Sequence, residues 1–219
     1  MKRIFFVCIM LIGVLAANAQ VVEKTFAELK NEGNAAVKAN DFAKALEMYE
    51  QAVAKLGENP ITDTMMVYNM GLFAVRAKNN EKALKYFDQS FSMNRMKVSS
   101  LLSKSDVLKA MKNDAESLKT MEAAYAIAPK DAKVKGKLAS YYVSQVSPIM
   151  AKGGEIINKA GAEVTAGKLK TSDAAYKTEI QGAKAEFEKA LLLCNKALGY
   201  DENNAAAKQL KAACQQALK

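Results

Sequence analysis

Any chemistry in this chain must come from lysines, carboxylates, hydroxyls or cysteines, because the sequence contains no histidine. The usual general base, histidine-based serine and cysteine triads, and histidine-containing zinc sites are therefore excluded. The carboxylates of Asp201-Glu202 are typical of a solvated helix end, and Lys152-Gly153-Gly154 lacks the length and lysine position of a phosphate-binding loop. We therefore expect that the protein is not an enzyme and needs no cofactor or metal.

The cysteines are the remaining reactive candidates, and there are three of them: Cys8, Cys194 and Cys214. Cys8 lies in a segment that we expect to be cleaved, which leaves two. In an exported protein Cys194 and Cys214 could form one disulfide. Two buried free thiols are the alternative, because free cysteine is among the most buried residue types.

The first 19 residues have the three parts of a secretory signal peptide. Met1-Lys2-Arg3 is basic, Ile4 to Leu15 carries no charge, and Ala17-Asn18-Ala19 provides a small-x-small cleavage pattern. The apolar stretch is shorter than the roughly 20 residues of a spanning helix. We predict an exported protein of a bacterial periplasm or cell envelope, or a secreted one, with no integral membrane span after cleavage.

The net charge is +9, from 32 lysines and arginines against 23 aspartates and glutamates. The lysines are spread along the whole chain with acids between them, which is typical of a solvated surface. The charge also favours an acidic or carboxylate-bearing partner. Export and the lack of an aromatic platform beside the lysines argue against nucleic acid.

The elements that position these groups are helices, because apolar residues recur at helical spacing from residue 22 onward. The stretch 41–56 is one example, with Asp41 as the expected N-cap. Asn79 and Asn113 begin similar segments. Hardly any stretch alternates with a period of two, and the chain has only three prolines. An all-α fold follows.

The helical pattern repeats in pairs. The second helix of each pair carries a small residue, a bulky one and another small one: Ala45-x3-Tyr49-x2-Ala52, Ala83-x3-Phe87-x2-Ser90 and Ser117-x3-Met121-x2-Ala124. The first helix of each pair carries its own pattern: Leu29-x3-Gly33-x2-Ala36, Val67-x3-Gly71-x2-Ala74 and Leu101-x3-Ser105-x2-Leu108. The small residues allow two antiparallel helices to approach closely, and the bulky ones fill the space beside the next unit.

This pattern resembles the tetratricopeptide-repeat (TPR) family, with its motif W-x2-L-G-x2-Y…A-x3-F…P. The matching residues are Gly33, Ala45, Tyr49 and Ala52, then Gly71, Ala83 and Phe87, then Ala124 and Pro129. Ser105, Ser117 and Met121 depart from it. The resemblance covers about residues 24–130 and implies an all-α, right-handed solenoid of helical hairpins, similar to exported TPR proteins of the Bacteroidetes type.

The chain therefore divides into a signal peptide (1–19), three TPR-like hairpins (20–130) and a C-terminal part (131–219). A fourth unit begins at Lys135, and we align its second helix on Ala190-x3-Cys194-x2-Ala197, which leaves an insert at about 147–185. We expect a long hairpin of 133–166 and 172–198, turning near Gly167, capped by Thr171 or Ser172, and kinked or interrupted at Pro148 and Gly153-Gly154. The segment 203–218 should then cap the stack. The insert is either part of that cap or a docking arm.

The resemblance implies that the first helix of each unit lines a concave groove that takes a peptide or helix. The residues expected there are Lys30, Asn34, Val37, Lys38, Met65, Tyr68, Asn69, Leu72, Arg76, Leu102, Asp106 and Lys109. Lys30, Asn34 and Asn69 also resemble part of the carboxylate clamp of chaperone-binding TPR proteins. Hydrogen bonds between helices are the alternative role for the two asparagines.

The predicted function is a non-enzymatic protein–protein interaction scaffold of the cell envelope, whose groove binds an unidentified peptide or protein segment. The alternative is a structural or assembly subunit that forms oligomers through the 147–185 arm.

Overall fold

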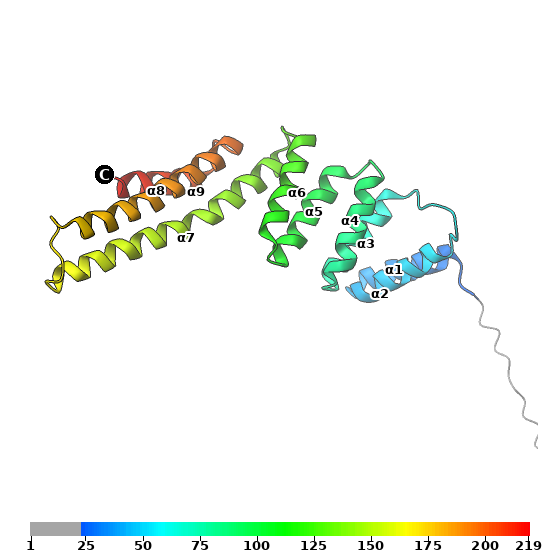
Figure 1. Cartoon of the computed structure of the whole chain (residues 1–219). Coiled ribbons are helices and arrows are strands. Elements are labelled where there is room, and N and C mark those ends of the chain that lie inside the picture. Colours follow the sequence, from blue (N-terminus) through cyan, green and yellow to red (C-terminus); the bar gives the residue numbers. More distant parts are fainter. Residues whose placement is uncertain (1–22) are drawn as a thin grey trace, which may run out of the picture.

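The computed structural model describes residues 23–219, which fold into nine helices arranged as a row of antiparallel hairpins (Figure 1). Their bounds are Phe26–Lys38 (α1), Phe42–Ala54 (α2), Thr64–Arg76 (α3), Asn80–Ser92 (α4), Lys97–Ala110 (α5), Asp114–Ile127 (α6), Ala132–Thr165 (α7), Ala174–Tyr200 (α8) and Ala205–Ala217 (α9). Within this range there is no strand, so the all-α prediction is confirmed. The predicted signal peptide lies outside the described residues.

The helix starts follow from side-chain capping. Asp41, Asn79 and Asn113 each accept a hydrogen bond from the backbone N–H three residues later, as the sequence predicts. α1 begins with a capping box in which Thr25 and Glu28 bond to each other's backbone N–H groups. These bonds satisfy donors that have no partner inside the helix.

The turns inside the three short hairpins are built in the same way. Asn40, Lys78 and Lys112 each adopt a left-handed backbone conformation, with φ of 60°, 58° and 61°. The residue after each one donates its N–H to a carbonyl of the preceding helix, five residues back. This left-handed ending terminates the helix and reverses the chain within a few residues.

In each of the first two hairpins, a glycine of the first helix lies close against an aromatic ring of the second helix. A Cβ atom on Gly33 would lie 2.5 Å from the Tyr49 ring, and one on Gly71 would lie 2.5 Å from the Phe87 ring. In the third hairpin Ser105 and Met121 take these places, and the Ser117 hydroxyl donates to the Ser105 carbonyl at 2.8 Å. The repeating small residues therefore act as predicted, by letting the helices approach.

Apolar clusters shared by neighbouring hairpins make the row continuous. Leu46 and Tyr49 of α2 share one apolar cluster with Val67, Met70 and other residues of α3 and α4. A second cluster joins α5, α6 and the start of α7 through Leu102, Val134 and Leu138. Each hairpin therefore packs on its neighbours in sequence, as in other repeat architectures.

The fourth hairpin is long, as predicted, and it consists of α7 and α8. Gly167, with φ of +71°, lies in its turn, but the N-cap of α8 is Asp173 and not Thr171 or Ser172. The carboxylate of Asp173 accepts the backbone N–H of Lys170, so it shapes the turn as well. The predicted N-cap, Thr171 or Ser172, therefore lies one to two residues before the observed one.

Pro148 and Gly153-Gly154 were predicted to kink or interrupt this arm. An interruption is wrong, because α7 runs unbroken from Ala132 to Thr165. Proline removes one helical hydrogen bond, here the one to the Ser144 carbonyl. Both Pro148 and Ser144 are exposed, so water can solvate that carbonyl. Gly153 is buried against Phe187, where its missing side chain lets α7 and α8 approach.

α9 is the cap that the sequence predicts at the end of the row. It buries Ala207 and Cys214 against α7 and α8, while polar and small residues such as Lys208 and Gln215 face outward. Its clusters reach no further along the hairpin than Met150 and Ala190. The turn end of α7 and α8 extends beyond it (Figure 1). Over residues 23–219 no helix combines the length and hydropathy that a membrane crossing needs.

Candidate functional site

α3 is the helix that positions the candidate site, because it is apolar on both sides. One side buries Met66, Val67 and Met70 in the core. The other side leaves Met65, Leu72 and Val75 exposed by 53%, 37% and 38%. A helix of a soluble domain normally presents a polar outer face. The outer side of α3 is therefore the best candidate for a binding surface.

A cavity of about 150 Å³ lies beside this face, between α3 and α5. Its lining residues are Leu72, Val75, Asn80, Phe87, Ser103, Asp106, Val107 and Ala110. Leu72 and Asp106 were predicted as groove residues. Val75 was missed, although it stands one helical turn after Leu72 and so shares its face. Phe87 was expected only as a core residue, but it also lines the cavity.

Three cations stand at the ends of the helices that lead into the hairpin turns. Lys38, Arg76 and Lys109 lie in the last turns of α1, α3 and α5. Within residues 23–219 none of the three has an ion-pair partner, although the Arg76 guanidinium lies 5.4 Å from the centre of the Phe42 ring. Cations at these positions stabilise the negative ends of the helix dipoles. Their charge also remains available to a partner.

The groove's other charged groups are already paired. The ammonium group of Lys137 on α7 forms an ion pair with Asp106 on α5. Lys30 on α1 lies 3.5 Å from the carboxylate of Asp63, the N-cap of α3. These two pairs join consecutive units across the groove. The charges of Lys30 and Asp106 are therefore used within the array.

Two predicted groove residues form hydrogen bonds between helices. The Tyr49 hydroxyl donates to the Asn34 side-chain oxygen at 2.6 Å. The Tyr68 and Ser103 hydroxyls share a hydrogen bond of 3.0 Å between α3 and α5. Of the three clamp-like residues, Lys30 is paired with Asp63 and Asn34 is bonded to Tyr49, so these two are not free clamp groups. Asn34 takes the structural role that was its alternative.

The remaining predicted residues divide by exposure. Val37 and Asn69 are half-buried, which leaves part of each side chain accessible. Leu102 is only 7% exposed and packs with Met121 and Leu138, so its prediction as a groove-lining residue is wrong. The cause is α7, whose first turns cover that side of α5.

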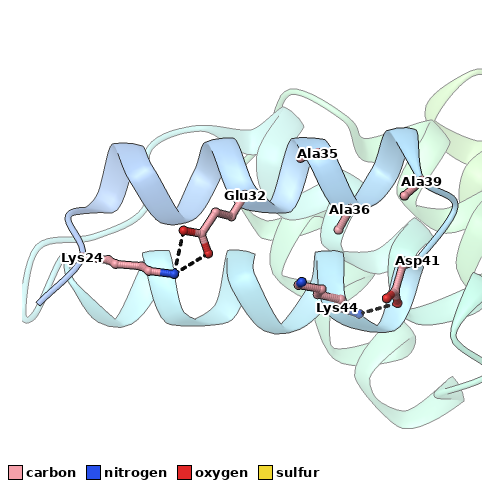
Figure 2. Close-up of a pocket in the computed structure, with 7 residues that line it drawn as sticks. All are labelled: Lys24, Glu32, Ala35, Ala36, Ala39, Asp41 and Lys44. Carbon is pink, nitrogen blue, oxygen red and sulfur yellow. Dashed lines mark hydrogen bonds and ion pairs between the residues drawn. The ribbon is translucent and has the colours of Figure 1, made fainter. Parts of the chain in front are cut away.

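A larger hollow of about 390 Å³ lies at the other end of the array, between α1 and α2 (Figure 2). Lys24 and Glu32 face each other across it at 2.6 Å, and Asp41 accepts the backbone N–H of Lys44. Its other walls are the small side chains of Ala35, Ala36 and Ala39. Because Lys24 and Glu32 pair with each other and the hollow has no large apolar wall, we do not take it as the site.

The two cysteines outside the groove lie together. Cys194 on α8 and Cys214 on α9 are fully buried in one apolar cluster, and the structure holds them as thiols. Among residues 23–219 no three histidine, cysteine or acidic side chains gather as metal ligands would.

Solved structures of similar shape identify the fold. A TPR repeats protein from Bacteroides fragilis superposes over 89% of this chain and 99% of its own, with a TM-score of 0.55 and 21% identity. The chain has the tetratricopeptide-repeat fold. MamA from Desulfovibrio magneticus shares the TPR-like arrangement over 89% of this chain and 92% of its own, with a TM-score of 0.50 and 15% identity. At these identities the likeness is one of fold.

Sequence comparison gives a shorter match. No family model matches the chain. An 84-residue segment is 37% identical to the photosystem I assembly protein Ycf3 of Acaryochloris marina, and 32% identical to that of Rippkaea orientalis. The match spans 38% of this TPR-fold chain and about half the length of those relatives.

Proposed function

We propose that this chain is an exported, non-enzymatic interaction scaffold whose groove along α1, α3 and α5 binds a segment of another protein. The TPR fold supports the general class of protein–protein interaction scaffold. The observation that carries the specific proposal is the outer face of α3, where Met65, Leu72 and Val75 are exposed beside a cavity. An exposed apolar strip of this kind costs solubility unless a partner covers it.

The chemistry of the partner follows from the side chains around the strip. The cavity between α3 and α5 suits one apolar side chain of moderate size. Lys38, Arg76 and Lys109 at the turn ends favour carboxylates elsewhere in the bound segment. The proposed ligand is therefore a short acidic segment with apolar anchors, in a helical or extended conformation.

The scaffold is rigid where the ligand would bind. Lys30–Asp63, Tyr68–Ser103 and Asp106–Lys137 tie neighbouring units together across the groove. A preformed groove loses little conformational entropy on binding, so the ordering cost falls on the partner. Variants that test the groove should therefore leave these three pairs unchanged.

The test compares apolar-to-lysine variants inside and outside the groove. Leu72→Lys and Val75→Lys alter the strip, while Leu192→Lys alters an exposed leucine on α8 outside the groove, which is 58% exposed. Each chain is cross-linked in its native cell envelope, and the cross-linked proteins are quantified by mass spectrometry. We expect a partner captured by the parent chain to fall at least about tenfold in both groove variants, since a hot-spot anchor is worth 2 kcal/mol or more.

Arg76→Glu adds a charge test, because it should weaken the same capture and reduce its dependence on salt. The proposal fails if both groove variants capture the same proteins as Leu192→Lys, in the same amounts. Export is tested separately by the mass of the chain from the envelope fraction, where a mature N-terminus at Gln20 is expected.

Assembly through the arm remains a second candidate, favoured by the projection of the α7–α8 turn beyond α9 (Figure 1). Replacing residues 151–186 by a short glycine-rich turn would remove the projecting part and leave the segments that contact α9. Sedimentation equilibrium decides between the two. A parent chain that is oligomeric and a shortened chain that is monomeric would favour assembly, whereas two monomers would exclude it.

A further inference from the structure

α9 is held to the rest of the molecule by a thin contact. Of its 13 residues, Ala207 and Cys214 are buried, whereas α2, of the same length, buries five. Both buried side chains are small, and Leu210 adds a partly buried contact. The apolar area that α9 removes from water is therefore modest for the element that must close the open end of the row.

Cys214 of α9 lies in the same buried cluster as a second cysteine, Cys194 of α8. Cys194 on α8 and Cys214 on α9 are both 0% exposed, and they share one cluster with Val146 and Ala190. The two thiols lie close enough to influence each other's pKa. A thiol is a weak donor and a weak acceptor, so two neighbouring thiols add little stability through hydrogen bonding.

A comparison within the molecule shows what the cysteines add. At the α4–α5 contact two other small side chains, Ser90 and Ser100, are also buried between neighbouring helices, and they form a hydrogen bond of 3.0 Å. Hydroxyls satisfy such a contact by hydrogen bonding alone. Two neighbouring cysteines can do one thing that two serines cannot, which is to form a covalent bond.

We propose that Cys194 and Cys214 form a disulfide that fastens the capping helix α9 to α8 when the chain folds in an oxidising compartment. The chemistry needs a disulfide donor such as oxidised glutathione or a thiol–disulfide oxidoreductase. One cysteine thiolate attacks the donor's S–S bond and releases one donor thiol. The second thiolate attacks this mixed disulfide and releases the other donor thiol, so that one S–S bond breaks and one forms.

The bond forms during folding and is protected afterwards. Burial raises the pKa of Cys194 to about 11 and also raises that of Cys214, so few thiolates exist in the folded chain at neutral pH. Before α9 docks, both thiols are open to solvent and ionise normally. Once the bond is made, the same burial shields it from reductants. Its occurrence in the cell rests on the proposed export, whereas its formation in vitro does not.

The test uses the full chain with Cys8→Ser, which leaves these two cysteines and prevents mispairing. The chain is unfolded in guanidinium and refolded either with dithiothreitol or in a buffer of oxidised and reduced glutathione. It is then denatured, alkylated and weighed by mass spectrometry. We expect two alkylated thiols after dithiothreitol. After the glutathione buffer we expect none, with Cys194 and Cys214 recovered in one cross-linked peptide.

Hydrogen exchange measures the fastening itself. Closing the loop between α8 and α9 should slow exchange of the α9 amides by about 100-fold relative to the reduced chain, with α1–α6 unchanged. A Cys194→Ser/Cys214→Ser variant cannot form the bond and should exchange like the reduced chain in both buffers. Two alkylated thiols after oxidative refolding would overturn the proposal, and so would equal α9 exchange with and without the bond. The same mass measurement on chain from the envelope separates a failure of the disulfide from a failure of export.

Discussion

The first two short hairpins and the long α7–α8 hairpin use the same packing device in different surroundings. In the short hairpins Gly33 and Gly71 lie under aromatic rings, and further hairpins cover the outside of those rings. In the long hairpin Gly153 lies under Phe187, with contacts of 3.0 Å instead of 2.5 Å for an added Cβ. Beyond this crossing α7 and α8 pack only on each other. We therefore expect a substitution in the arm to destabilise the arm locally, and a substitution in the array to destabilise the whole array.

The largest expected difference comes from removing the two rings. Phe87→Ala should destabilise the chain by about 4 kcal/mol, because Phe87 is fully buried among helices of the array. Phe187→Ala should cost about 3 kcal/mol and act on the arm, which has fewer neighbours. Urea unfolding gives the stability, and hydrogen exchange shows where protection is lost. Loss of protection throughout α1–α6 in Phe187→Ala would contradict the comparison.

Adding a methyl group at the glycines tests how tightly each crossing is closed. Gly71→Ala should cost about 2 kcal/mol through overpacking against Phe87, and Gly153→Ala about 1 kcal/mol. Gly182→Ala is the control, because a Cβ there meets nothing within 4 Å, and it should stabilise α8 by up to about 1 kcal/mol. Urea midpoints check all three, and a Gly71→Ala chain as stable as the parent would refute the tight crossing.

The hydrogen bond between Tyr86 and Glu50, which joins the first two hairpins, should contribute less stability than the ring and glycine contacts. The Tyr86 hydroxyl donates to Glu50 at 2.6 Å, and Lys82 donates to the same carboxylate at 2.7 Å. Tyr86→Phe should cost about 1 kcal/mol at neutral pH, whereas Tyr176→Phe on the arm should cost nothing measurable. The measurement is again the urea midpoint of each variant.

The same tyrosine gives the array an alkaline dependence. Burial, together with the bond to Glu50, raises the pKa of Tyr86 above its ordinary value of 10. The folded state therefore holds this proton more tightly, and the stability it adds below pH 10 is lost as the pH rises further. The difference between the parent and Tyr86→Phe should shrink above pH 10, and a constant difference would argue against a buried, bonded hydroxyl.

The smallest effect is expected in the arm under acid. Hydrogen bonds from Lys152 and Lys189 hold the pKa of Glu186 below its ordinary value of 4.5. The carboxylate therefore adds stability above pH 4.5, and that contribution is lost as the pH falls through the lower folded value. Thermal midpoints of the parent and Glu186→Gln should differ at pH 7 and converge near pH 3. A gap that widens under acid would contradict this assignment.

Much of the fold could be predicted from residue types alone. Asp41, Asn79 and Asn113 cap helices because their short polar side chains reach the backbone N–H groups, and that is a local property. The small and bulky residues of the three short hairpins recur at fixed spacing, and this pattern predicts the crossings. The register of the long hairpin was less predictable. We aligned its second helix on Cys194, whereas the aromatic that meets a glycine is Phe187, flanked by Ala183 and Ala190.

The sequence by itself determined the helices, their turns and the repeating close crossings, because capping, left-handed turns and small-to-bulky spacing act over a few residues. Only the tertiary structure decided which groove residues are available. α7 covers Leu102, Tyr49 engages Asn34, and packing on α5 turns Val75 toward a cavity. It also brought Cys194 and Cys214 together, 20 positions apart, since the docking of α9 on α8 depends on burial between helices and not on any local pattern.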